Sequence, residues 1–296
     1  MSHSLNDTHD AGYLIYLESK DATILRDNGA TAFFFLNKVI SPSDPSMNLM
    51  VGVVDCEIPV SFYNINNNNN KITINTHEII LPLQNYSAFN IQDDINAQLL
   101  IASIPVSVDF SQQSNKFTFS PSSVGATIVI NGGTLSKYLG LVDSQLNNVA
   151  STSPIIGENC CNLAGTSNIY ISSNFNINSI NSTGQYSGIL AKIQTDAPSS
   201  SYIFYQPSPV SLHVVSNIST SSIVISLLDD ERNPVDLNGL FFSLTLSIEY
   251  SYKREGRNYG KFLLGENNEN NKNNKNNKNN ENNENNDNDK SEIADL

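Results

Sequence analysis

Apolar and polar side chains alternate along several short segments of this chain, and this alternation limits the fold more than any other feature. In Leu244–Tyr250, apolar side chains at every second position are separated by Thr, Ser and Glu. Val106–Phe110 repeats the pattern. Because successive side chains of a strand point to opposite faces, a period of two predicts strands with one buried and one hydrated face, as in antiparallel sheets.

Many such segments, separated by turn residues, predict an all-β protein built as a sandwich or barrel. Asp27-Asn28-Gly29 and Arg232-Asn233-Pro234 are typical of the turns between them. The strands are expected at residues 13–17, 32–36, 49–58, 71–81, 104–110, 116–120, 126–130, 168–172, 188–193, 202–205, 210–215, 222–227 and 240–250.

Two short helices are expected in the connections between strands. Four apolar residues fall on one face of the first helix, and Asn90 is expected to cap it. They are Ile91, Ile95, Leu99 and Ala102. A shorter helix is expected over Leu135–Leu139, with Thr134 as its N-cap and Gly140 as its stop.

The 296 residues divide into three parts by composition. Residues 1–11 are expected to form a flexible N-terminal arm, and 12–262 a folded domain. Residues 263–296 form an Asn-rich acidic tail that is expected to be disordered, because no apolar residue occurs between Gly265 and Ile293 to build a core. Residues 145–165 have weak periodicity and are interpreted as a long loop or as a boundary between two β subdomains. An inserted or second β subdomain within 145–200 stays open.

The formal net charge of −13 disfavours nucleic acid and anionic membranes as partners over most of the surface. Four basic residues nevertheless follow the last strand: Lys253, Arg254, Arg257 and Lys261. They allow a weak contact with packaged nucleic acid or with a neighbouring subunit, or they form the solvated end of a sheet. No signal peptide and no membrane span are expected, because no apolar run is long enough.

Residues that could carry chemistry are few and scattered. The three cysteines include the adjacent pair Cys160 and Cys161, which suits neither a disulfide framework nor a zinc site, and we expect the pair in a loop without a nucleophilic role. Asp229-Asp230-Glu231 is interpreted as an acidic turn between strands. We therefore expect no catalytic, cofactor-binding or metal-binding residues, no cofactor and no enzymatic activity.

Four stretches occur in an order that resembles the single jelly-roll minor capsid (penton) proteins of virophages and polinton-like viruses. They are LMVGVVDCEIPVSFYNIN at 49–66, ILPLQNYSAFNIQDDIN at 80–96, FTF at 117–119 with LSKYLGL at 135–141, and LLDDERNPVDLNG at 227–239 running into 241–250. The resemblance covers residues 13–250. It implies a jelly-roll β-sandwich, a homopentamer at icosahedral vertices and contact with the major capsid protein. It also implies a location in the virion after assembly in the host cytoplasm.

Subunit contacts are expected at aromatic residues in loops, for which packing in the core is the open alternative. These residues are Phe62, Tyr63, Tyr86, Phe89, Tyr186 and Tyr205. Other functions also stay open, namely a different minor capsid role as cement or spike protein, or a carbohydrate-binding β-sandwich adhesin. A cupin-like or glycosidase jelly roll would need clustered His or paired inward carboxylates, and the sequence does not show them.

Overall fold

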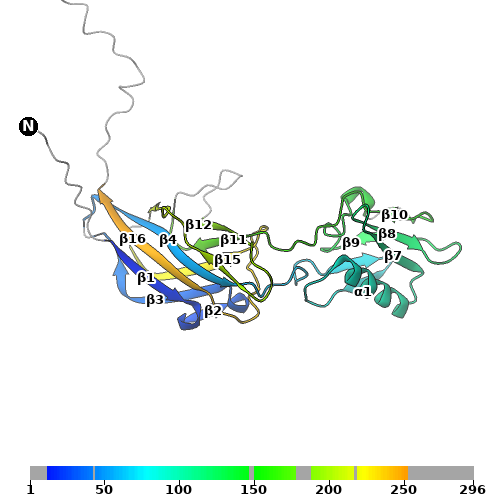
Figure 1. The fold of residues 1–296 in the computed structure, drawn as a ribbon, viewed down its shortest axis with the longest axis horizontal. Coiled ribbons are helices and arrows are strands. Elements are labelled where there is room, and N and C mark those ends of the chain that lie inside the picture. The colour runs from blue at the N-terminus through cyan, green and yellow to red at the C-terminus, as the bar shows by residue number, and fades with distance from the viewer. Residues whose placement is uncertain (1–11, 43, 147–149, 178–187, 217–218, 253–296) are drawn as a thin grey trace, which may run out of the picture. The chain divides into compact units, whose positions relative to one another are not determined.

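The structure is a computed structural model that describes residues 12–42, 44–146, 150–177, 188–216 and 219–252 (Figure 1). In these ranges strands dominate and α1 (Ala88–Ile101) is the single α-helix, so the all-β prediction is confirmed. The expected arm at 1–11 and the expected tail at 263–296 lie outside the described residues.

Two five-stranded antiparallel sheets form the first part of the fold. The β4 sheet consists of β1 (Tyr13–Glu18), β16 (Ser243–Tyr252), β4 (Met47–Pro59) and β13 (Tyr202–Tyr205), with β14 (His213–Val215) also paired to β4. The β15 sheet consists of β12 (Ile189–Gln194), β11 (Asn168–Ser173), β15 (Thr220–Leu228), β3 (Thr31–Ile40) and β2 (Ile24–Arg26).

The connections between these strands are those of a jelly roll. The chain passes from β1 to β3 in the other sheet, returns to β4, and then crosses to β11 and β12. It crosses again to β13, to β15 and finally to β16. The last strand therefore lies between β1 and β4, and the two termini of the domain pair side by side. Such connections produce a double-layered antiparallel sandwich.

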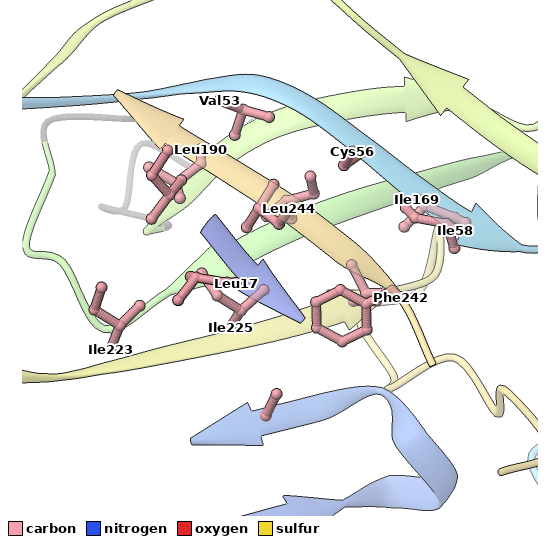
Figure 2. Packing of buried hydrophobic residues seen from close by; sticks show 14 of the residues in the cluster. Leu17, Val53, Cys56, Ile58, Ile169, Leu190, Ile223, Ile225, Phe242 and Leu244 are labelled. Atoms are coloured by element: carbon pink, nitrogen blue, oxygen red, sulfur yellow. The ribbon is translucent and has the colours of Figure 1, made fainter. Parts of the chain in front are cut away.

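The jelly-roll core lies between the two sheets and contains the inward-facing residues of both. Leu17 and Leu244 come from the β4 sheet, and Ile169 and Ile225 come from the β15 sheet (Figure 2). Each of these side chains is 5% exposed or less. The period-two pattern of the sequence thus identifies the buried side of the strands, because burial of apolar surface favours the pairing of the two inward faces.

A second core is built entirely from the chain between β4 and β11. Its buried residues extend from Ile65 to Leu141, and Leu163 packs partly buried against them. One of its three-stranded sheets contains β10 (Ile155–Ile156), β8 (Lys116–Pro121) and β7 (Val106–Ser111). The other contains β6 (His77–Ile80), β5 (Lys71–Ile74) and β9 (Ile130–Gly132). We call the chain between β4 and β11 the inserted region.

Helix α1 packs one face against this second core. Ile91, Ile95 and Leu99 are buried, as the helical spacing predicted. The side chain of Asn96 fixes the helix to β7, because its amide donates to the Val108 carbonyl at 2.7 Å and its oxygen accepts from the Val108 N–H at 2.8 Å.

Three sequence predictions about local structure are wrong in detail. The N-cap of α1 is Ser87, whose hydroxyl oxygen accepts from the N–H of Asn90 at 3.2 Å, so Asn90 lies inside the first turn. No regular helix forms at 135–139, where the chain makes a series of turns. The Thr134 hydroxyl, expected to cap that helix, instead accepts from the Lys71 N–H. The strand expected at 71–81 is a hairpin, which turns at Asn75 with φ of 55°.

Short elements complete the described fold. The strands β2 and β10 are too short to show an alternation of their own, and the sequence did not predict them. The strand expected at 126–130 begins only at Ile130. Three 3-10 helices occur in the described ranges, namely η1 (Ser19–Asp21), η2 (Asp27–Gly29) and η3 (Asp143–Gln145).

We predict that Ile225→Ala destabilises the folded chain by about 2–5 kcal/mol, because it removes a fully buried side chain between the two sheets and leaves a cavity. The matched control is Ile24→Ala in the same sheet, where the side chain is 39% exposed and the expected loss is under about 1 kcal/mol. Denaturant unfolding followed by circular dichroism measures both. Equal losses would contradict the assignment of Ile225 to the buried face of the sheet and of Ile24 to its outward face.

We also predict that Ser87→Ala costs about 1 kcal/mol of stability, because it removes the acceptor for an N–H group at the start of α1. Asn90→Ala should cost less, since residue 90 is helical and Ala has the higher helix propensity. Thermal unfolding of the two variants measures the difference. A larger loss of stability for Asn90→Ala than for Ser87→Ala would indicate that Asn90 is the N-cap.

Candidate interaction surfaces

The side chains that could hold a metal lie apart from one another. Among the described residues, no group of three or more His, Cys, Asp or Glu side chains could bind a metal ion. The ring Nε2 of His213 lies 3.0 Å from the Leu190 carbonyl oxygen and is engaged in the packing of β14. The candidate functional features of the described residues are therefore surfaces.

The three cysteines are free and differ in burial. Cys56 is 2% exposed in the jelly-roll core, and its burial, reinforced by the charges of Asp55 and Glu57, raises its pKa to about 12. Cys160 is exposed in a loop, as expected. Burial is also the main reason why the pKa of Cys161 is raised.

The acidic triplet is a structural turn, as the sequence predicted. One Asp229 carboxylate oxygen accepts from the N–H groups of Glu231 and Asn233, each at 2.8 Å. The Asp230 carboxylate accepts from the backbone N–H of Ser167 at 2.8 Å. The turn is therefore held by its own carboxylates.

Glu231 adds a contact from this turn to the inserted region. Its carboxylate accepts a hydrogen bond from the Lys137 ammonium and another, at 3.0 Å, from the Tyr138 hydroxyl. The hydrogen bond from Lys137 is the main reason why the pKa of Glu231 is lowered. All three carboxylates of the triplet thus have structural partners, which accounts for them without acid–base catalysis.

The aromatic residues expected at subunit contacts are mostly not on the surface. Phe62 is 9% exposed and Tyr86 is 5% exposed, so both belong to the cores. Tyr205 packs partly buried against the jelly-roll core, and Tyr63 is also partly buried. Phe89 alone among the described members is well exposed, at 45%. Tyr186 lies outside the described residues.

The outward face of the β4 sheet carries large apolar side chains on both of its edge strands. On β1, Leu14 is 46% exposed and Tyr16 is 74% exposed. On β13, Tyr202 is 49% exposed and Phe204 is 72% exposed, with 6.3 Å between their ring centroids. The sequence analysis did not identify these residues.

The outward face of the β15 sheet is similarly apolar. Phe35 on β3 is 59% exposed, and Ile24 on β2 is 39% exposed. The register pairs Ile24 with Phe33, so these side chains share one row of the outward face. The guanidinium of Arg26 lies 5.0 Å from the centre of the Phe33 ring, within the range of a cation–π contact.

A signal for these faces is present in the sequence. Three segments consist only of apolar or aromatic residues. They are YLIYL at 13–17, AFFFL at 32–36 and YIFY at 202–205. A strand that is apolar on both sides is typical of a sheet covered on both faces. An alternating pattern identifies strands with one apolar and one polar face. A continuous apolar run identifies strands whose outward face is also apolar.

Comparisons with known proteins include a distant likeness to a solved structure. No family model matches the chain, and no curated protein matches it. The crystal structure of selenomethionine-labelled mavirus penton protein is similar, with a TM-score of 0.40 and 15% sequence identity. The match covers 81% of this chain and 100% of that chain. We therefore base the function on the side chains of this chain.

The sequence predicted a basic segment after the last strand and no membrane-spanning segment. The four basic residues after the last strand lie outside the described residues. In the part of the chain that the structure describes, α1 has neither the length nor the apolar composition to cross a membrane, and it is the only α-helix there.

We predict that a thiol reagent such as dithionitrobenzoate labels Cys160 rapidly at pH 8, while Cys56 reacts only after unfolding. A pKa of about 12 leaves Cys56 with almost no thiolate at that pH, and the core excludes the reagent. Cys160→Ser should remove the rapid phase and Cys56→Ser should retain it. The reverse result would place Cys56 on the surface.

Proposed function

We propose that this chain is a structural virion protein, a minor capsid (penton) protein that works by packing against other subunits. Its copies assemble as a homopentamer at the icosahedral vertices and contact the major capsid protein of the same particle. The protein is assembled in the host cytoplasm and resides in the virion. No catalytic step is part of this function.

The observation that carries the proposal is the apolar character of the outward faces of both jelly-roll sheets. Tyr16 and Phe204 on the β4 sheet are 74% and 72% exposed, and Phe35 on the β15 sheet is 59% exposed. Outward faces of antiparallel sandwiches are normally hydrated and polar. Large apolar side chains gathered there indicate surfaces that another protein covers.

The architecture suits ring formation. A jelly roll has two different outward faces, so one face of a copy can bind the other face of the next copy in a heterologous contact. Such contacts close into a ring when the rotation between copies divides a full turn evenly. A permanent interface buries on the order of 2,000 Å² or more, which outward faces of five strands can supply.

Four basic residues beyond the last described strand are proposed to make a weak contact with a neighbouring subunit or with packaged nucleic acid. Lys253, Arg254, Arg257 and Lys261 follow β16 directly in sequence and are interleaved with aromatic residues. They supply positive charge in a chain of net charge −13, which favours an acidic patch on a neighbouring subunit. A weak contact with packaged nucleic acid would use the same charges.

The mass of the full-length chain in solution tests the proposal. We expect a species of five times the 32.5 kDa chain mass, with ring-shaped particles in negative stain. Light scattering after size exclusion, repeated over a range of protein and salt concentrations, measures it. A chain that stays monomeric under all these conditions, and also with the major capsid protein present, would overturn the proposal.

We predict that Tyr16→Ser combined with Phe204→Ser weakens self-association about tenfold or more, because exposed aromatic anchors contribute most to such contacts. Phe89→Ser is the matched control, since that ring is 45% exposed on α1 of the inserted region and belongs to neither jelly-roll sheet. Sedimentation velocity measures the association, and circular dichroism verifies that each variant is folded. An effect confined to Phe89→Ser would move the contact to the inserted region.

A further inference from the structure

We propose that the outward faces of the two jelly-roll sheets are the two halves of one contact, in which the acidic face of one copy binds the basic face of the next. This inference rests on the self-assembly proposed above and specifies which surfaces meet. The acidic face is the outward side of the β4 sheet, and the basic face is the outward side of the β15 sheet.

The strands of the β4 sheet carry only negative formal charge. Their charged residues are Glu18, Asp55, Glu57 and Glu249, and no Lys or Arg occurs in β1, β4, β13, β14 or β16. The register places Glu57 opposite Ser243 on one side and Phe204 on the other. Asp55 lies opposite Thr245, which in turn pairs with Tyr16. The carboxylates therefore share rows with the exposed aromatic rings.

The strands of the β15 sheet carry only positive formal charge. Their charged residues are Arg26, Lys38 and Lys192, and no Asp or Glu occurs in β2, β3, β11, β12 or β15. Lys192 pairs in register with Tyr170, and its ammonium lies 5.7 Å from the centre of that ring. Arg26 and Lys192 of this face, like Glu57 of the other, lie beside aromatic residues. Lys38 has the same place in the alternation of β3 as the core residues Phe34 and Ile40, so it is not counted in the outward face.

Further charges flank the two faces, so the segregation by sign applies to the strand positions themselves. Lys20 follows β1 and forms an ion pair with Glu18, so three carboxylates of the acidic face remain without it. On the basic side, the guanidinium of Arg232 lies 3.7 Å from the centre of the Tyr170 ring and adds a cation. The acidic turn beside it is held by its own structural hydrogen bonds, and Asp27 begins the turn after β2.

The charges select a heterologous contact over a symmetric one. Two acidic faces or two basic faces would bring like charges together, which costs several kcal/mol at a protein interface. An acidic face against a basic face gains attraction, and it leaves the first copy with a free basic face and the second copy with a free acidic face. Successive copies then add in the same way, as a ring requires.

Charge reversal on one face at a time tests this pairing. The acidic-face variant is Asp55→Lys with Glu57→Lys, and the basic-face variant is Arg26→Glu with Lys192→Glu. All four residues are on outward-facing strand positions, and three of them are exposed, Asp55 being partly buried. Self-association of the full-length chain is measured by sedimentation velocity at low and at high salt.

Each variant should associate at least tenfold more weakly than the natural chain at low salt, because one face then repels its partner face. The quadruple variant should regain association, because its faces are again opposite in sign. That variant keeps the formal net charge of −13, so its recovery cannot come from a change in total charge. The differences between variants should shrink as salt screens the charges.

Asp93→Lys with Asp109→Lys is the matched control. It makes the same change in net charge as the acidic-face variant, but on exposed positions of α1 and β7 in the inserted region. It should associate as tightly as the natural chain. Unfolding curves of all variants establish that each is folded.

The outcomes separate this inference from the proposed function. Self-association that is unaffected by either reversal, or quadruple variants that fail to recover while folded, would overturn the face pairing and leave self-assembly intact. A loss in only one of the two single-face variants would indicate that the contact uses one face against another surface, which also overturns the pairing. Failure of the natural chain to associate at all would overturn both.

Discussion

The strict alternation of side-chain direction along a strand is the constraint on which the rest of this structure depends. Packing of the two five-stranded sheets commits one set of side chains, such as Leu17 and Ile225, to a shared core. The other set is then directed outward without further choice. The composition of that outward set determines what the molecule can bind. Burial of the inward side chains therefore also determines that Tyr16 and Phe35 are exposed on the outward faces.

The long inserted region is compatible with this constraint because it has a core of its own. Its buried residues pack among themselves, from Ile65 onward, and the sheets of the jelly roll remain complete without them. Backbone hydrogen bonds join the inserted region to the jelly roll where the chain leaves it. The Val60 N–H, for example, donates to the Ser201 carbonyl at 2.8 Å. A connection that closes on its own core can be long without disturbing the strands that flank it.

The separation of charge between the two sheets follows the same logic. Strand positions that face outward are free of packing requirements, so their charges reflect what each face binds. Asp55 and Glu57 lie in rows with aromatic rings on one face, and Lys192 lies beside Tyr170 on the other. Each face therefore combines apolar area, which gives affinity, with one sign of charge, which gives orientation. A surface kept only for solubility would mix both signs.

Period-two alternation in the amino-acid sequence was sufficient to locate most strands and the all-β class, and helical spacing was sufficient to identify the buried face of α1. They did so because these depend on local periodicity. Only the tertiary structure decided which strands share a sheet, that Ser87 caps α1, and that Phe62 and Tyr86 are buried while Tyr16 and Phe204 are exposed. Those outcomes depend on contacts between segments far apart in the chain. An aromatic residue has the same strand propensity whether it is buried or exposed. Its place in the sheet determines whether its side chain faces the core or the solvent.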